Sequence, residues 1–385
     1  MTPSDDSCDV AQWRRHLHAH PELAFEENAS ADFVVEQLRS FGFTKINRGL
    51  ASTGVVASLS GRHPGSGSIG LRADMDALPV QEENHFEHRS RHPGKMHACG
   101  HDGHTAMLLG AARDLARDPD FAGTVHFIFQ PAEEGGGGGK RMVEQGLFDL
   151  FPCDSVYALH NWPGLPAGHF AVKPGPIMAS ADRFDLVVNG KGGHAAMPHR
   201  CIDPVPAAAQ IVTALQTLVS RRLDPLHTAV LSVTQFHAGD AYNVIPEHAI
   251  LRGTLRTFDD GVRDTFMARI ASLATQLAAA HGCTAEVSWK EGYCATVNHP
   301  AQASKAAQAA ASVVGADKVN PACEPSMASE DFSYMLRARP GAYMFIGNGP
   351  GESGCALHNP HYDFNDAILP TGIAFWRALV RQELS

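Results

Sequence analysis

The 385-residue sequence has no long apolar run, and its N-terminus is polar and acidic. A membrane-spanning helix needs about 20 consecutive apolar residues, and a secretory signal peptide needs an apolar segment near the N-terminus. The sequence also lacks a C-x-x-C pair, and its eight cysteines are scattered. We therefore expect no membrane interaction, a reducing cytoplasmic location, and free thiols in place of a disulfide framework.

Basic residues are in the minority, since 41 Asp and Glu outnumber 31 Lys and Arg, which gives a formal net charge of −10. A negative surface repels a phosphate backbone, so we expect no nucleic-acid partner. Hydrophobic residues at 44% and charged residues at 19% are typical of a globular enzyme. A chain of this length exceeds one compact core, which favours two domains.

Metal-binding side chains are concentrated at residues 96–104, which read MHACGHDGH. These nine residues hold three histidines, a cysteine and an aspartate. Imidazole and thiolate groups are ligands of zinc, manganese, nickel or cobalt. Cys99 and His101 are two residues apart, so their side chains would point the same way on an extended segment. Taken alone, the pattern fits a His-rich loop with a buried cysteine equally well.

A carboxylate pair follows the apolar strand that we predict over residues 124–130. Glu133 and Glu134 stand between this strand and five consecutive glycines. Carboxylates at the end of a buried strand are costly unless they meet a cation. Neighbouring side chains point in different directions, so one can bind metal while the other transfers a proton. A phosphate-binding loop does not fit, because Glu134 replaces its first Gly and Arg141 its Ser or Thr.

Two more histidines and an acidic pair stand near other predicted strands. His160 follows one strand directly, His358 comes after a second, and Asp74 and Asp76 follow a third. We expect the two aspartates to contact the metal ligands and orient them, without binding metal themselves. Because α/β folds place their sites at one edge of the sheet, the joint pattern indicates a single site. The candidate metal ligands are Cys99, His101, Glu134, His160 and His358.

The middle of the chain has the pattern of a separate domain. Its predicted elements follow the order strand-helix-strand-strand-helix-strand, an α+β sandwich of about 110 residues. We expect this inserted domain over residues 182–292, within a discontinuous α/β catalytic domain over residues 1–181 and 293–385. Inside the catalytic domain, the glycines and serines at residues 65–68 predict a hairpin tip between two strands.

Four motifs together resemble the M20 metallopeptidase family: HACGHDGH, QPAEEG, LHNWP and LHNPHYDFND. The resemblance covers almost the whole chain and is to the amidohydrolase branch, with its hippurate hydrolases, N-acyl-amino-acid amidohydrolases and auxin-conjugate hydrolases. It implies a metallopeptidase-like catalytic domain with two divalent metal ions, Mn, Zn, Ni or Co, and an inserted dimerisation or lid domain. The wider family has His-x-Asp where this sequence has Asp74-Met75-Asp76, which implies Cys99 as the metal-bridging group.

The resemblance also implies roles for individual residues. The five candidate ligands keep that role, and Glu133 is the general base. The histidine that matches His194 stabilises the oxyanion in the other subunit's site, and Asn243 matches a substrate-contacting asparagine. Arg252 or Arg256 could bind a substrate carboxylate through two hydrogen bonds, and the sequence does not distinguish them. A homodimer, or a tetramer built from it, is expected.

The expected reaction is hydrolysis of an N-acyl-L-amino acid, hippurate-like or N-acetyl, to a carboxylate and an amino acid. Metal-activated water would attack the amide carbonyl, with Glu133 as the base. A serine hydrolase would give the same products, but the sequence has no G-x-S-x-G elbow. A metal-storage protein would need no base beside its ligands. Within the family, a dipeptidase or an N-acetyl-diaminopimelate deacetylase is the alternative.

Overall fold

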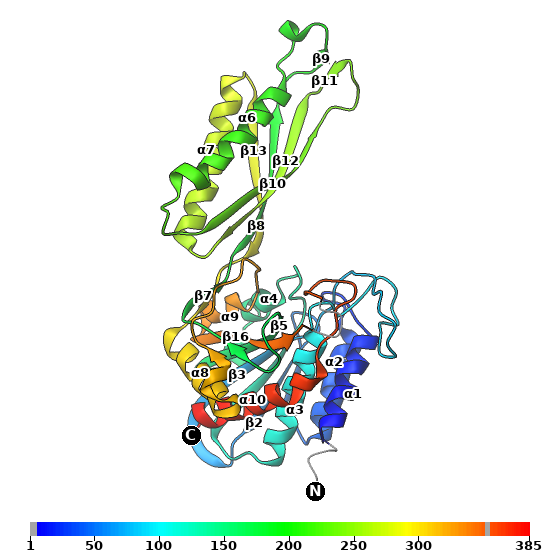
Figure 1. Ribbon diagram of the computed structural model, residues 1–385, viewed down its shortest axis with the longest axis vertical. Coiled ribbons are helices and arrows are strands. Elements are labelled where there is room, and N and C mark those ends of the chain that lie inside the picture. Colours follow the sequence, from blue (N-terminus) through cyan, green and yellow to red (C-terminus); the bar gives the residue numbers. More distant parts are fainter. Residues whose placement is uncertain (1–5, 351–354) are drawn as a thin grey trace. The chain divides into compact units, whose positions relative to one another are not determined.

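The computed structural model describes residues 6–350 and 355–385, and the chain divides into two compact units. The larger unit comprises Met1–Ile177, Val297–Glu324 and Asp331–Ser385. The smaller unit comprises Met178–Thr296 and Pro325–Glu330. Figure 1 labels the helices and strands of both units. The predicted fold class, a mixed α/β chain of two domains, is confirmed.

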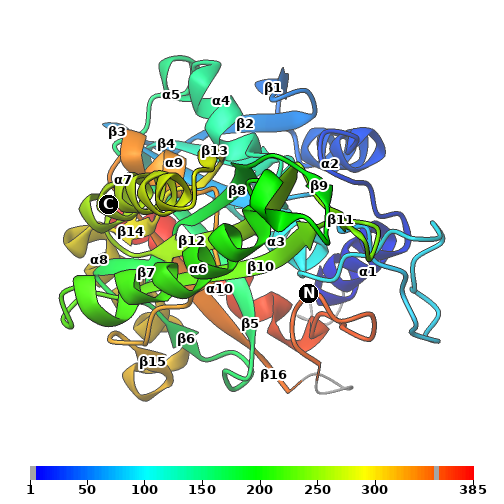
Figure 2. The same ribbon diagram turned by 90° about the horizontal axis from the view of Figure 1, so that it is seen from above.

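The larger unit is built on an eight-stranded sheet in the order β1-β2-β4-β3-β5-β16-β6-β15, with β1 and β15 at opposite edges (Figure 2). The four central strands β4, β3, β5 and β16 are parallel, so their carboxyl ends meet at one edge. β5 and β16 are buried along most of their length, β4 over its last six residues and β3 over its second half, and the buried parts are mainly apolar. The strands are β1 (Ile46–Leu50), β2 (Gly54–Ser60), β3 (His63–Asp74), β4 (Ala122–Gln130), β5 (Ser155–Pro163), β6 (Phe170–Ala171), β15 (Val319–Asn320) and β16 (Gly341–Gly349).

The hairpin tip predicted at residues 65–68 is wrong. These residues belong to β3, and β4 lies between β2 and β3, antiparallel to one and parallel to the other. The glycines serve a close approach of two backbones. A Cβ atom at Gly123 would lie 2.1 Å from the carbonyl oxygen of Gly67. The glycine-rich segment therefore lets β3 lie beside β4 and does not reverse the chain.

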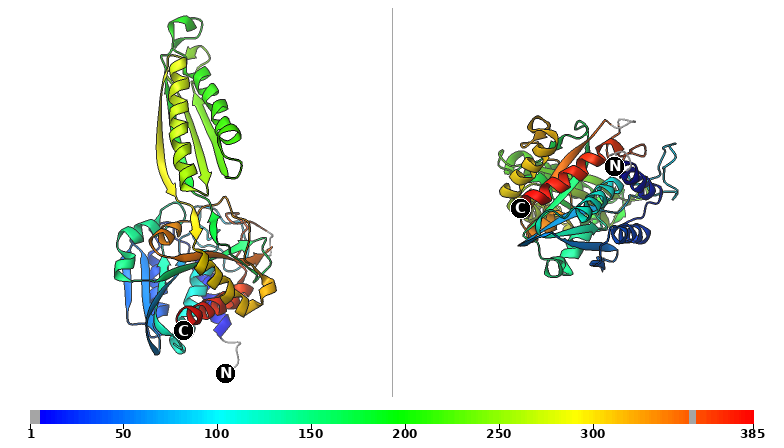
Figure 3. Two further views of the ribbon diagram at one scale, coloured as in Figure 1. Left: turned by 90° about the vertical axis from the view of Figure 1, so that its left-hand side faces the viewer. Right: turned by 90° about the horizontal axis from the view of Figure 1, so that it is seen from below.

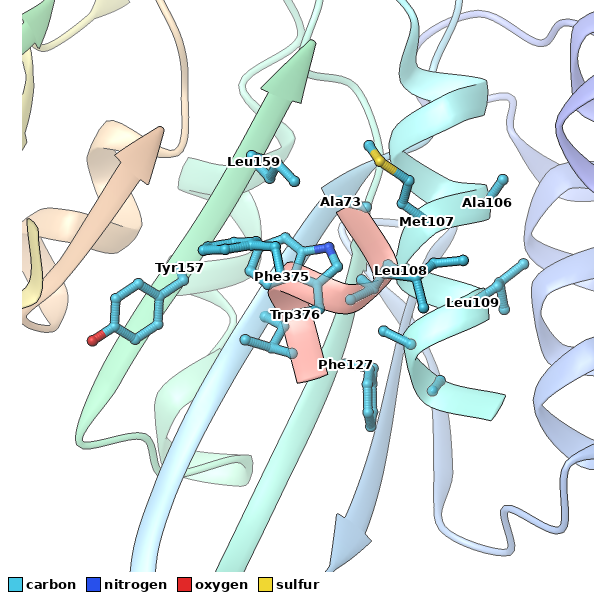
Figure 4. Close-up of a cluster of buried hydrophobic side chains, with 14 of the residues drawn as sticks. Ala73, Ala106, Met107, Leu108, Leu109, Phe127, Tyr157, Leu159, Phe375 and Trp376 are labelled. Atoms are coloured by element: carbon cyan, nitrogen blue, oxygen red, sulfur yellow. The ribbon is translucent and has the colours of Figure 1, made fainter. Parts of the chain in front are cut away.

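Helices α3 (His101–Arg117) and α10 (Leu369–Glu383) pack on the central strands. Figure 4 shows Phe375 and Trp376 of α10 in one buried cluster with Tyr157 of β5 and Met107 of α3. Burying each such side chain stabilises the fold by about 1.5–3 kcal/mol. Almost every residue of α3 is buried, so its position is closely fixed by packing. The other helices of this unit are α1 (Asp6–Ala19), α2 (Asn28–Ser40), α4 (Gly138–Glu144), α5 (Leu147–Leu150), α8 (Pro300–Val314), η3 (Ala316–Lys318), α9 (Ser333–Ala338) and η4 (Asp366–Ile368).

The smaller unit is a four-stranded antiparallel sheet in the order β10-β12-β8-β13, with two helices on one face (Figure 3). Residues alternate between buried and more exposed along β8 and β12, as expected for a sheet covered on one face. Asp203 and Asp259 cap the two helices by accepting backbone N–H bonds. The elements are β8 (Ala181–Asn189), α6 (Pro204–Thr217), η2 (Leu218–Arg222), β10 (Ala229–Ala238), β12 (His248–Thr257), α7 (Asp260–Ala280) and β13 (Thr284–Tyr293).

Short elements complete the two units. A two-stranded ribbon of β9 (Gly193–His194) and β11 (Val244–Ile245), with η1 (Pro198–Arg200) nearby, belongs to the smaller unit. The chain passes between the units at β7 (Gly175–Met178) and β14 (Thr296–Asn298). Over the described ranges, none of the helices has the length and apolar character of a membrane span. The seven cysteines with described side chains are free, as predicted, and the side chain of Cys8 lies outside this description.

A buried ionic network joins α1 to the first turn of α3. His18 Nδ1 lies 2.8 Å from Asp102 Oδ2, and His18 Nε2 lies 3.2 Å from Glu82 Oε1. Arg14, also fully buried, donates to the Phe364 carbonyl and pairs with Asp363. Burial lowers the pKa of His18, but Asp102 and Glu82 outweigh it and raise the value to about 9.

We expect this histidine to make stability depend on pH. The folded pKa of His18 is about 9 and an unfolded histidine titrates near 6.5, so its contribution is complete below 6.5 and is lost as pH rises through 9. The difference corresponds to about 3 kcal/mol. Urea unfolding at pH 6.5 and 9.5 measures it. His18→Asn should be less stable than wild type at pH 6.5 and should lose less stability between the two values. An equal loss of unfolding free energy in both proteins between the two pH values would contradict the prediction.

Candidate active site

The site begins at the turn that follows β4. Ala132, one residue before Glu133, has a left-handed backbone with φ of +55°. The Glu134 N–H donates to Asp76 Oδ2 at 2.8 Å, which ties this turn to the segment after β3. Metal-ligating atoms of His101, Glu133 and Glu134 all lie within 4.8 Å of one another. The turn therefore places the carboxylates of Glu133 and Glu134 at the carboxyl edge of the sheet.

Two histidines direct the same ring nitrogen into this space. His101 Nδ1 lies 2.9 Å from the Asp76 carbonyl oxygen, and His160 Nδ1 lies 2.7 Å from the Asn161 carbonyl oxygen. A carbonyl only accepts, so both Nδ1 atoms carry a proton. His101 Nε2 is buried and has no hydrogen-bond partner, while His160 Nε2 lies 3.5 Å from Cys99 Sγ. A carbonyl that fixes the tautomer in this way is typical of metal-ligating histidines.

Cys99 and His358 complete the predicted ligands. Ligating atoms of Cys99, Glu134 and His358 lie within 4.8 Å of one another, and His358 Nε2 is 3.2 Å from Glu134 Oε1. His358 has a left-handed backbone with φ of +65°, and its N–H donates to the Ala98 carbonyl at 2.7 Å. Such a backbone is unfavourable for a non-glycine residue and persists where the surroundings determine it. The structure thus brings all five predicted ligands and Glu133 together.

Asp74 and His104 support this arrangement. His104 Nδ1 lies 2.6 Å from Asp74 Oδ1, and its Nε2 accepts from the Asn161 N–H at 3.0 Å. Both ring nitrogens of His104 are therefore engaged, so it fixes its neighbours instead of binding metal. Asp74 Oδ2 accepts from Arg72 at 2.8 Å and lies 3.6 Å from His101 Nε2. His104 is not among the site residues predicted from the sequence, although it stands in the same motif, three residues after His101.

The electrostatics of the site favour cations. Burial lowers the pKa of His101, but Asp74, Asp76 and Glu134 outweigh it and raise the value to about 10. Burial, followed by the charges of Glu134, Glu133 and Asp74, raises the pKa of the Cys99 thiol well above its usual range. A Cys99 thiolate therefore requires a nearby positive charge. A buried Glu134 carboxylate oxygen and a buried His101 imidazole nitrogen, neither with a hydrogen-bond partner among the described residues, are suitable donors for a divalent metal ion.

The four other predicted site residues belong to the smaller unit. His194 is exposed on β9, where its Nδ1 accepts the Ala196 N–H at 3.1 Å, and Asn243 stands next to β11, the paired strand. Arg252 donates to Gln235 at 3.1 Å and lies 3.4 Å from an Asp185 carboxylate oxygen.

The partners of Arg256 differ from those of Arg252. Arg256 is half-buried and contacts the Met327 carbonyl at 3.4 Å. Burial, followed by the charge of Arg183, lowers the pKa of Arg256, although Asp182 raises it. The Arg252 guanidinium lies beside an acidic neighbour, whereas that of Arg256 is destabilised by its surroundings.

Comparison with known proteins identifies the family. Residues 70–382 match peptidase family M20/M25/M40, so the chain belongs to this family. It is 49% identical over 294 residues to an N-acyl-L-amino acid amidohydrolase of Geobacillus stearothermophilus, covering 76% of this chain and 78% of the relative. It is 38% identical to a hippurate hydrolase of Campylobacter jejuni, covering 96% and 95% of the two chains.

A solved structure agrees with this assignment. A dinuclear metal binding peptidase from the M20 family of Bacillus subtilis superimposes with a TM-score of 0.86 at 34% identity, over 98% of each chain. The resemblance to the amidohydrolase branch of the family is therefore confirmed, and so is the prediction that the chain is a hydrolytic enzyme.

Proposed function

We propose that this chain is a metal-dependent amidohydrolase that cleaves N-acyl-L-amino acids into a carboxylate and an amino acid. The observation that carries the proposal is the position of Glu133. This buried carboxylate lies beside a preformed set of metal ligands at the carboxyl edge of the sheet. A storage or sensor protein would not need such a group. The names of the two curated relatives point to the same reaction.

Two divalent metal ions fit the residues present. Cys99, Glu134 and His358 form one group of ligating atoms, and His101 and His160 belong to a second, which also contains the supporting Asp74 and His104. Glu134 and His101 approach within 4.0 Å, so the two groups are adjacent. When bound, the ions polarise the amide carbonyl and lower the pKa of water. Mn, Zn, Ni and Co all accept this mixture of imidazole, thiolate and carboxylate.

The chain's own residues carry the proton and hold the substrate. Glu133 takes the proton from the attacking water and delivers it to the leaving nitrogen. His194 donates to the oxyanion of the tetrahedral intermediate, and Asn243 contacts the substrate. Arg256 binds the substrate carboxylate, because its guanidinium lacks the carboxylate neighbour that Arg252 has in Asp185.

A homodimer through the smaller unit completes the proposal. β10 and β13 are the edge strands of its sheet, and β10 exposes Val230 and Phe236 at 40% and 41%. An exposed apolar edge strand is stabilised when a second chain covers it, and a two-fold axis lets both subunits use the same surface. In such a dimer His194 serves the partner subunit's site.

Chelation tests the proposed function. Dialysis against a chelator at neutral pH should abolish hydrolysis of N-benzoyl- and N-acetyl-amino acids, and adding Mn, Zn, Co or Ni should restore it. Metal analysis measures loading, and peptide mapping of alkylated Cys99 should show protection in the loaded protein. Indoleacetyl-amino acids, dipeptides and N-acetyl-diaminopimelate complete the panel and identify the substrate class. Full activity with negligible bound metal would overturn the proposal.

A further inference from the structure

Besides His358, four of the described residues other than glycine have left-handed backbones: Phe25, Ala51, Ser52 and Ala132. They come from three segments that are distant in the sequence. The carboxylate of Glu27 contacts all three segments, through Phe25, Ala132 and Thr53. Unfavourable backbone conformations persist only where surrounding contacts hold them, and they cluster at functional sites. The hydrogen bonds of Glu27 are therefore the contacts that connect these three segments to one another.

Glu27 accepts three hydrogen bonds in the interior of the larger unit. Its Oε1 accepts the Phe25 N–H at 3.0 Å and the Ala132 N–H at 2.8 Å, and its Oε2 accepts the Thr53 hydroxyl at 2.5 Å. The residue is completely buried. Burial raises the pKa of Glu27 to about 7, and the charge of Asp76 acts in the same direction. A buried carboxyl is costly, so these contacts are its compensation.

Glu27 occupies the position directly before α2, but its side chain makes no cap bond to that helix. The first amides of α2 are bound by a different residue, because the Ala29 and Ser30 N–H groups donate to Glu22 at 3.1 and 2.8 Å. The Glu27 carboxylate therefore faces the active-site turn while Glu22 caps the helix. This division provides a matched pair of glutamates for a test.

The turn depends on contacts of this kind for its shape. Pro131 precedes Ala132, and Glu133 and Glu134 follow it. Asp76 holds the Glu134 N–H and Glu27 holds the Ala132 N–H, so one carboxylate fixes each side of Glu133. A Cβ atom at Gly136 would lie 2.7 Å from Ala132 Cβ and 3.1 Å from the Phe25 ring, so the turn and the Phe25 segment are tightly packed.

We propose that Glu27 is a positioning residue, whose carboxylate holds Ala132 in its left-handed conformation and so aims the Glu133 carboxylate for proton transfer. This inference rests on the proposed function for its kinetic part. The proposed role depends on the hydrogen bonds that the Glu27 side chain accepts and not on its negative charge. The oxygen of a glutamine could accept the same two N–H bonds, and its amide could donate to the Thr53 hydroxyl.

Kinetics of three variants test this positioning. Glu27→Ala should lower kcat by about 10²-fold and leave KM within about three-fold, because a small displacement of a reacting group has this effect. Glu27→Gln should keep kcat within about three-fold of wild type. Glu22→Ala, the matched control, should lower Tm and leave kcat unchanged, because the Glu22 carboxylate caps α2 at Ala29 and Ser30 and not at the active-site turn. Metal content should stay at the wild-type level in all three.

Hydrogen exchange gives a readout that does not depend on activity. Mass spectrometry of the loaded protein should show faster exchange of the peptide over residues 127–139 in Glu27→Ala, but not in Glu27→Gln or Glu22→Ala. If wild type fails to hydrolyse N-acyl amino acids, the proposed function fails and exchange alone decides the role of Glu27. Unchanged exchange in Glu27→Ala would overturn the inference, as would a Glu27→Gln enzyme as impaired as Glu27→Ala.

Discussion

Glu133→Gln should lower kcat by about 10²–10⁴-fold, because the amide keeps the shape of the side chain but cannot accept a proton from water. Glu133 is buried and its carboxylate lies within 4.8 Å of the ligating atoms of His101 and Glu134. Since Glu133 is proposed as the base and not as a ligand, metal content should stay at the wild-type level. Metal analysis and a hippurate assay on the same preparation measure both quantities.

The neighbouring carboxylate provides the control. Glu134→Gln should lower metal content first and activity as a consequence, because Glu134 Oε1 lies among the ligating atoms of Cys99 and His358. Excess metal should then restore part of the activity of Glu134→Gln and none of Glu133→Gln. A Glu133→Gln enzyme with wild-type kcat would remove Glu133 from the mechanism. Loss of metal from Glu133→Gln would instead indicate that Glu133 is a metal ligand.

The sequence was sufficient to predict which side chains meet at this edge, because each of the five candidate ligands stands in a distinctive local context. Cys99 and His101 share a dense motif, Glu134 follows the apolar strand β4, and His358 lies in a segment rich in polar side chains. His160, predicted to follow a strand, lies within β5, three residues before its end. The parallel order of the central strands brings these segments to one edge, as the strand-end pattern indicated. The spacing of apolar residues was also enough to predict the main helices and strands, since each element buries apolar side chains along one side.

Contacts between distant segments could not be predicted in this way. The Ala132 N–H donates to a carboxylate 105 positions earlier, and no spacing or motif relates the two residues. The place of β4 between β2 and β3 is a further example, because a glycine-rich segment is compatible with both a turn and close strand packing. His104 is a different case. Its motif is recognisable in the sequence, but its supporting role becomes clear only from its contact with Asp74.

Mixing two nearly inactive variants should restore activity if His194 serves the partner subunit. His194→Ala alone should lower kcat by about 10²–10³-fold without loss of metal, because it removes one oxyanion donor. His194 is exposed on a unit that is separate from the predicted ligands, which are all in the larger unit. In a dimer of His194→Ala with Glu133→Gln, one site would combine an intact Glu133 with an intact His194 from the neighbour.

Random exchange at equal ratio makes half of the dimers mixed, and one of the two sites in each mixed dimer is then intact. Activity should therefore recover to about a quarter of the wild-type value. Subunits with two different tags must first show that exchange has occurred. A mixture of His194→Ala with wild type sets the baseline for dilution, because it should keep about half of the wild-type activity whether His194 serves its own site or the partner's. If exchange is verified and no activity returns, His194 acts within its own chain or has no part in the reaction, because a partner's histidine would have completed the site.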